Sequence, residues 1–386
     1  MKTVSTLWDS PHRIFFLLTI IWALLSMLLW GLTLFLSVPF NPPGGPLLWH
    51  IHEFLFALSG AAIIGFMLTA VPEFTSTEPV NYVWLKRLAG LWLAGRVAYI
   101  TAHWLTPAIW LAAMADTLML ITLLTLTTPV LWQDLTRKHL SLPLALLLLL
   151  IVNVMFYYEL PHPGRALQST HLLMGTLMIL LLLALARISM SMVNSALEEK
   201  QAEAEPYLAR PPRRQLAIIC ILLFSVCSWY FPAAGINAWL ALAAAAAILN
   251  ILNDWHLGRV LLRRWVLLPY CTLWLMAAGY AQLGISGLLY GSVSSGGQHL
   301  LAAALMTAII YVVLVAGGVH SGWGLDERKR VIILIATALL LLQLRALASL
   351  VPAAYYPLLA IAAGGWMLSW LLVLTISWRT LWQRPA

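Results

Sequence analysis

Long runs of apolar residues, separated by short polar or Gly- and Pro-rich segments, make up most of the chain. A run of about 20 apolar residues is long enough to cross the hydrocarbon of a bilayer as an α-helix. Segments such as NPPGG (41–45) and PHPG (161–164) supply turns between consecutive runs. The pattern predicts an all-α, polytopic membrane protein with about twelve transmembrane helices. The predicted helices are 14–38, 47–72, 83–105, 107–132, 141–160, 166–190, 215–232, 236–253, 265–287, 297–319, 331–351 and 355–378.

One longer polar segment interrupts this pattern near the middle of the chain. It contains EEKQAEAE and RPPRR and covers residues 191–214. We interpret it as a cytoplasmic linker between an N-terminal six-helix half, 1–190, and a C-terminal six-helix half, 215–386.

Composition supports a membrane location, because 62% of the residues are hydrophobic and only 9% are charged. Soluble domains carry about 25% charged residues. The Lys and Arg residues lie almost entirely in every second connection, as at 86–87, 137–138, 259–264 and 328–330. The positive-inside rule then predicts a multi-pass membrane protein with both termini in the cytoplasm. Since topology accounts for the basic residues, nothing indicates nucleic-acid binding.

The stretch LLWHIHEFLF (47–56) places His50, His52 and Glu53 inside an apolar segment, where polar groups are costly unless they are bound. His171 and His299 lie at the same predicted depth, at the outer ends of the sixth and tenth helices. Imidazoles from different helices at one depth can form a haem or copper site in a helix bundle. For any single one of these histidines, an interfacial residue without a ligand is the alternative.

Helical geometry separates the roles of the two neighbouring histidines. His50 and Glu53 are three residues apart and share a face, whereas His50 and His52 are about 200° apart. We therefore expect His50, oriented by Glu53, as the metal ligand. His52 would then be a hydrogen-bonding neighbour or a ligand of another metal.

Three further charges interrupt apolar helices. Arg96 and Asp116 lie at equal depth on consecutive helices, so an ion pair is favoured over a proton pathway. Arg345 has two possible partners at its depth: Glu53, or a haem propionate that it would bind with a bidentate guanidinium.

Several of these segments resemble the NnrS family of bacterial membrane proteins. The similarity lies in SPHRIFFLL (10–18), in LLWHIHEFLFALSGAAIIGFMLTAVPEF (47–74), in LAGLWLAGRVAYI (88–100) and in HLLAAALMTAIIYVVLVAGGVHSG (299–322). It implies a twelve-helix inner-membrane protein with haem and copper, linked to nitric oxide stress and denitrification. The residues that match the family pattern are Arg13, His50, His52, Glu53, Arg96, His299 and His320. The chain departs from that pattern at LALARISMSMVNS (183–195) and at NVMFYYEL (153–160).

These observations predict a haem-binding membrane protein, with copper as a second candidate metal, that serves the nitric oxide response or related redox physiology. The expected partners are the lipid bilayer, the haem iron, nitric oxide or another small ligand, and a further membrane protein. Whether the protein is an enzyme stays open. Two other classes remain: a secondary transporter, since many carriers have twelve helices in two halves, and an accessory or assembly subunit of a respiratory complex. The residues expected to hold cofactor or metal are His50, His52, His171, His299, His320 and Arg345, with Glu53, Arg96 and Asp116 as buried charges around them.

Overall fold

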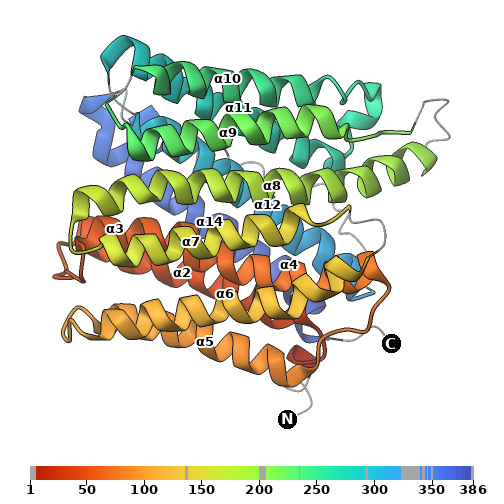
Figure 1. Ribbon diagram of the computed structural model, residues 1–386, viewed down its shortest axis with the longest axis horizontal. Coiled ribbons are helices and arrows are strands. Elements are labelled where there is room, and N and C mark those ends of the chain that lie inside the picture. Colours follow the sequence, from red (N-terminus) through yellow and green to blue (C-terminus); the bar gives the residue numbers. More distant parts are fainter. Residues whose placement is uncertain are drawn as a thin grey trace. The chain divides into compact units, whose positions relative to one another are not determined.

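The computed structural model describes residues 6–134, 138–199, 206–233, 235–291, 294–322, 340, 344–345, 347–348 and 351–383. Regular secondary structure within these residues is helical throughout, which confirms the all-α class (Figure 1). The N-terminal helices are α2 (Pro11–Phe35), α3 (Gly45–His52), η1 (Glu53–Ala57), α4 (Leu58–Thr75), α5 (Tyr82–Thr101), α6 (Ala108–Gln133), α7 (Ser141–Glu159) and α8 (Pro163–Glu199). They are followed by α9 (Pro211–Tyr230), α10 (Ile236–Leu252), η2 (Gly258–Leu262), α11 (Arg264–Tyr290), α12 (Ser295–His320), η3 (Pro352–Ala354) and α14 (Tyr355–Trp382).

Every predicted span overlaps one of these helices except 331–351, most of which lies outside the described residues. Among the described residues, nine helices are long and apolar enough to cross a membrane. Helix α10 is shorter, at 17 residues, and α5 carries Lys86, Arg87 and Arg96. The sixth predicted span continues as α8 through residues 191–199, which the sequence placed in the linker.

The chain divides into two compact units, each built from separate chain segments. The first unit contains Met1–Leu173, Val312–Val331 and Met367–Ala386, and the second contains Met174–Tyr311 and Ile332–Trp366. The first unit therefore contains segments from both predicted six-helix halves. The division into the halves 1–190 and 215–386 stays a prediction.

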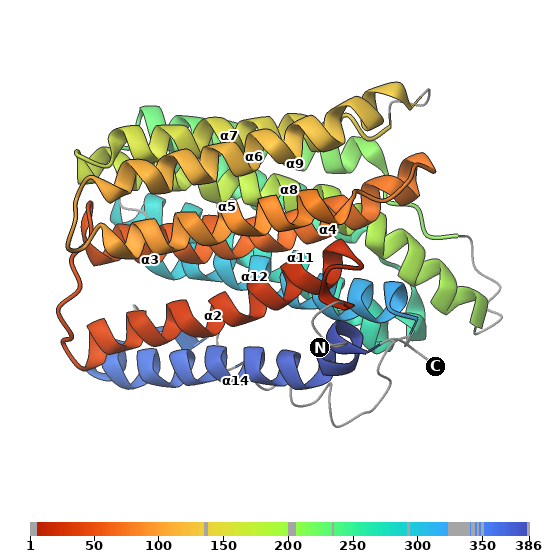
Figure 2. The ribbon, with the colours of Figure 1, turned by 90° about the horizontal axis from the view of Figure 1, so that it is seen from below.

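Within the first unit, α5, α6 and α7 run side by side, and α2 packs against α4 (Figure 1). The beginning of α2 and the end of α14 lie together at one end of this unit (Figure 2). There the hydroxyl of Thr6 donates to the carbonyl of Trp382 at 3.2 Å, and the Arg13 guanidinium donates to the carbonyl of Gln383 at 3.1 Å.

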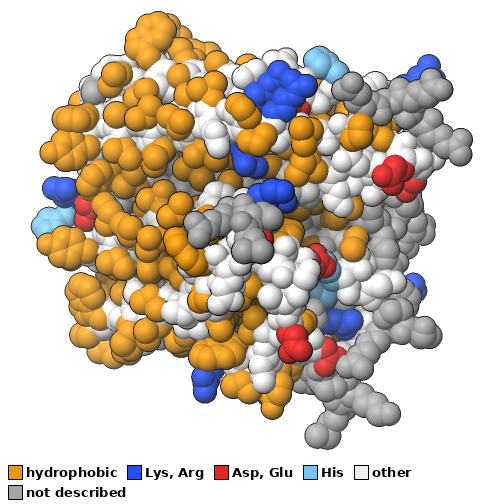
Figure 3. Space-filling model, turned by 45° about the vertical axis from the view of Figure 1, so that its right-hand side comes forward, with side chains coloured by type: hydrophobic (Ala, Val, Ile, Leu, Met, Phe, Trp, Pro, Cys, Tyr) orange, Lys and Arg blue, Asp and Glu red, His pale blue; other side chains and the backbone are white. Residues whose placement is uncertain are grey.

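Exposed apolar side chains recur along the helices with helical periodicity. On α6 the exposed side chains include Leu111, Met114, Leu118 and Ile121, which recur every three or four residues. Such a stripe would be a liability in water but suits lipid. Figure 3 shows hydrophobic side chains spread over much of one face of the molecule. We conclude that the apolar helices span a membrane.

The second predicted span is one continuous helix with a wider turn inside it. Helix α3 leads into the π-helical turn η1, which leads into α4. The carbonyl of Ala57, at the end of this turn, accepts a hydrogen bond from Trp92 Nε1 of α5 at 2.8 Å. A π turn inside an α-helix is rare and often marks a functional site. This one lies directly after the two histidines.

A glycine allows α3 to begin where it does. Gly44 has φ of 82°, in the left-handed region that other residues rarely adopt. A Cβ atom at Gly44 would also lie 2.6 Å from Leu160 Cδ1. The turn before α3 thus depends on the missing side chain, and it packs the beginning of this helix against the end of α7.

Gly65 provides a test of the packing between α2 and α4. A Cβ atom there would lie 2.9 Å from a ring carbon of Phe16 and 3.0 Å from Phe15 Cβ. We expect Gly65→Val to lower the free energy of unfolding by about 1–3 kcal/mol, because it overpacks this contact. At Gly90 a Cβ atom would meet no other atom within 4 Å. Gly90→Val is therefore the matched control, and thermal unfolding in mild detergent should show equal midpoints for it and the wild type.

Candidate functional site

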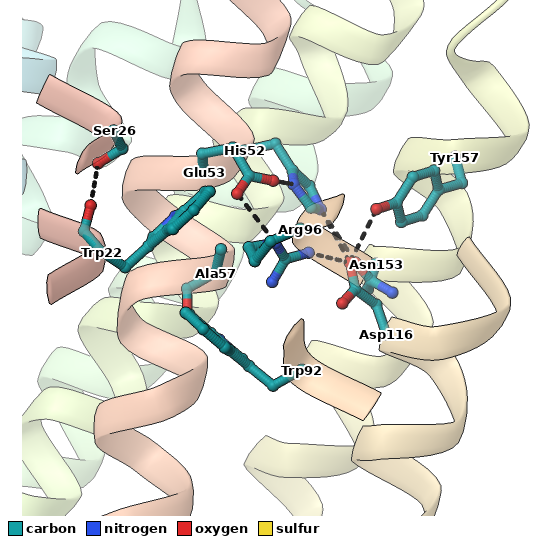
Figure 4. Close-up of polar contacts among 10 residues, drawn as sticks. All are labelled: Trp22, Ser26, His52, Glu53, Ala57, Trp92, Arg96, Asp116, Asn153 and Tyr157. Atoms are coloured by element: carbon teal, nitrogen blue, oxygen red, sulfur yellow. Dashed lines mark hydrogen bonds and ion pairs between the residues drawn. The ribbon is translucent and has the colours of Figure 1, made fainter. Parts of the chain in front are cut away.

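A buried network of charged and polar side chains lies inside the first unit (Figure 4). His52 ends α3, Glu53 begins η1, Arg96 lies on α5, and Asp116 lies on α6. None of the four side chains is more than 1% exposed. Because charges in a low-dielectric interior are unstable unless they are paired, their contacts determine whether this region can fold.

Arg96 is the centre of this network. Its Nη2 atom donates to Asp116 Oδ2 at 2.6 Å, and its Nε atom lies 2.9 Å from Glu53 Oε2. The predicted Arg96–Asp116 ion pair is thus confirmed. Glu53 pairs with Arg96, and Arg345 donates to Ser295 Oγ at 3.2 Å in the second unit. The possible pairing of Glu53 with Arg345 stays a prediction.

Glu53 contacts the neighbouring histidine, not the one three residues earlier. Glu53 Oε1 lies 2.9 Å from His52 Nδ1. The expectation that His50 and Glu53 face each other assumed uniform α-helical spacing, but the wider π turn begins at Glu53. The His50 ring instead stacks on Trp30, with centroids 4.2 Å apart, and contacts Phe54 at 4.4 Å.

Helix α7 contributes two members that the sequence did not reveal as site residues. The Tyr157 hydroxyl donates to Asp116 Oδ2 at 2.8 Å, and Asn153 Oδ1 lies 3.4 Å from His52 Nε2. A signal for Asn153 was available, because it is the one amide in the apolar run LLLLLIVNVMF (146–156). Tyr157 had no such signal, since tyrosine is also common in helices for packing alone.

Close approach of α5 and α6 brings the charges together. A Cβ atom at Gly95 would lie 2.5 Å from Asp116 Oδ1. Only a glycine before Arg96 leaves room for the carboxylate beside the guanidinium. The ion pair between Arg96 and Asp116 therefore depends on Gly95 as well as on the two charged residues.

The remaining predicted residues lie outside this network. In the first unit, His171 on α8 has a buried Nδ1 atom for which the described residues offer no hydrogen-bond partner. In the second unit, His299 Nδ1 donates to the Ser295 carbonyl at 2.7 Å. Arg345 also contacts Ser295, and its Nη1 atom is buried without a partner among the described residues. Ser295 therefore connects His299 and Arg345, which the sequence expected near each other.

His320 lies at the end of α12, in the first unit. Its Nδ1 atom is 3.0 Å from Glu73 Oε1, and its ring centroid is 5.9 Å from that of His12. Within the described part of the chain, no three His, Cys, Asp or Glu side chains are grouped so as to hold a metal ion. The role of His320 in cofactor binding stays a prediction.

These features define an integral membrane protein in which apolar helices surround a buried ion network. The chain belongs to the NnrS family, whose model, described as NnrS protein, matches residues 6–384. The resemblance seen in the sequence is therefore confirmed over nearly the whole chain. No curated protein matches it.

Replacing Arg96 tests the network directly. Arg96→Met removes the shared cation of two carboxylates that stay buried, and we expect it to lower the free energy of unfolding by about 3–5 kcal/mol. Arg165→Met is the matched control, because Arg165 is 66% exposed and lies 3.5 Å from Glu159. Exposed ion pairs contribute about 0–1 kcal/mol. Equal unfolding midpoints for the two variants would show that Arg96 does not hold the carboxylates.

Proposed function

We propose that this protein is a haem-binding membrane protein of the nitric oxide response, in the bacterial inner membrane. Family membership suggests a membrane protein of that response. The observation that carries the haem proposal is the group formed by His299, Ser295 and Arg345, because it combines a metal-binding imidazole with an arginine that has no acidic partner among the described residues.

The His299 side chain suits a metal ligand. When its Nδ1–H donates to the Ser295 carbonyl, Nε2 is the nitrogen that carries a lone pair. Metal-binding histidines commonly donate their other ring N–H to a backbone carbonyl in this way. His299 would thus hold a haem through its iron, and a bound haem would supply a metal able to take up nitric oxide or another small molecule.

Arg345 supplies what the carboxylates of haem need. Its buried Nη1 donors lack a partner among the described residues, and such donors are costly unless an acceptor is bound. A propionate accepts hydrogen bonds from guanidinium in a bidentate geometry. We therefore assign Arg345 to a propionate and His299 to the iron.

Two histidines of the first unit are further candidate metal ligands. His171 is the preferred residue, since its buried Nδ1 lacks a partner among the described residues. His50, whose ring lies between Trp30 and Phe54, is the alternative. Copper remains a second candidate metal, because imidazole binds both metals.

We further propose twelve transmembrane helices with both termini in the cytoplasm. The contacts of Thr6 and Arg13 with the end of α14 support placing both ends of the chain on one side. The basic residues Lys86, Arg87 and Arg379 support assigning that side to the cytoplasm.

The haem proposal predicts a coloured protein. Full-length protein purified in mild detergent should show a Soret band and contain iron near stoichiometry. His299→Ala should abolish or shift the band by removing an iron ligand, and Arg345→Met should lower haem retention. The controls are His103→Ala, at an exposed turn where the ring accepts from Asn41 N at 3.0 Å, and Arg87→Met, whose guanidinium lies over Trp84. A colourless, metal-free protein from cells supplied with iron would favour the transporter or the accessory subunit.

Reporter fusions test the topology. Fusions after Arg137, within 195–205 and at the C-terminus should report a cytoplasmic location, because these positions flank basic connections. A fusion near Gly164 should report the outer side. A C-terminal fusion that reports the outer side would contradict the number of helices.

A further inference from the structure

Four aromatic rings pack around His52, whereas the described residues show no such ring contact for His171 or His299. The ring stacks on Phe156 with centroids 4.8 Å apart and on Phe56 at 5.0 Å. The rings of Tyr99 and Tyr157 meet it edge-on at 5.4 and 5.2 Å. None of these five side chains is more than 3% exposed. A macrocycle beside His52 would have to displace this aromatic packing.

Both ring nitrogens of His52 are directed at oxygen atoms of the protein. Nδ1 lies 2.9 Å from Glu53 Oε1. Nε2 lies 3.4 Å from Asn153 Oδ1 and 3.8 Å from Asp116 Oδ2. An imidazole that binds a metal uses one nitrogen for the metal and gives the other to a hydrogen-bonding partner. Here neither nitrogen points to an open position (Figure 4).

His52 lies where its contacts can hold the π turn in place. His52 is the last residue before the π turn, and Trp92 fixes the end of that turn by donating to the Ala57 carbonyl. Through Glu53 the ring is linked to Arg96 of α5, and through Asn153 it reaches α7. His52 thus joins the turn to two neighbouring helices.

We propose that His52 binds neither haem nor metal, and that it is instead the hydrogen-bonding residue that holds the π turn of the second span against α5 and α7. The second histidine and the glutamate of the WHIHE segment therefore belong to the ion network. The cofactor proposed above takes its ligands from other histidines. The role of His52 in the fold does not depend on the haem proposal.

Two replacements of His52 separate ligation from hydrogen bonding. Gln keeps a donor and an acceptor but ligates haem iron poorly, whereas Phe keeps the ring shape but has no polar atom. We expect His52→Gln to keep the wild-type Soret band and iron content and to unfold near the wild-type midpoint. His52→Phe should unfold at a clearly lower midpoint, because Glu53 and Asn153 lose a buried partner.

The decisive comparison is with His299→Gln, which should lose the Soret band while its unfolding midpoint stays near that of the protein without haem. Loss of haem in folded His52→Gln would overturn the proposal, as would His52→Phe with the wild-type midpoint.

The energetic coupling between His52 and Asn153 can be measured without haem. Asn153→Leu should lower the midpoint in the wild type and lower it less in His52→Phe. Equal shifts in both backgrounds would also overturn it. Colourless wild-type protein would reject the haem proposal alone, since these unfolding measurements would still test His52.

Discussion

The guanidinium of Arg96, held between Glu53 and Asp116, is the interaction on which the first unit depends. Each carboxylate comes from a different span, and neither is exposed. Without the shared cation, two negative charges would remain in a low-dielectric interior, where the loss of a partner costs several kcal/mol. The requirement to bury all three together fixes the rotation of α5 and α6 about their axes. It also explains why Gly95 precedes the arginine, because any side chain there would meet Asp116.

The sequence predicted the helices well because lipid imposes a simple rule. A span must be apolar over about 20 residues, and loops must carry turn chemistry, so the runs and the turns are both visible. The differences between the predicted and observed elements have two causes that hydropathy does not report: helix propensity and tertiary contacts. Residues 191–199 continue α8 because SALEE (195–199) favours a helix even though its charges suit water. Tertiary contacts, not composition, place segments distant in the sequence in one compact unit.

For the site, the sequence revealed which charged residues are buried, but not the directions in which their side chains point. The depth of Arg96 and Asp116 on antiparallel helices was enough to predict their pairing, because depth can be counted from the helix ends. The partner of Glu53 was not predictable in this way. The π turn changes the direction of side chains at this position, and nothing in EFLFA indicates a wider turn. Asn153 could have been noticed as an isolated amide, whereas Tyr157 resembles many packing residues.

The contact between Arg13 and the end of α14 has a consequence for biogenesis. The guanidinium of Arg13 donates to the carbonyls of Leu381 and Gln383, which follow it in the chain by 368 and 370 residues. Spans enter the bilayer in chain order, so α2 is inserted before all the helices that separate it from α14, the helix whose end it contacts. The contact at this end of the first unit can therefore form only after α14 has been inserted. The order of insertion, as well as the energy of the contacts, decides when the unit becomes complete.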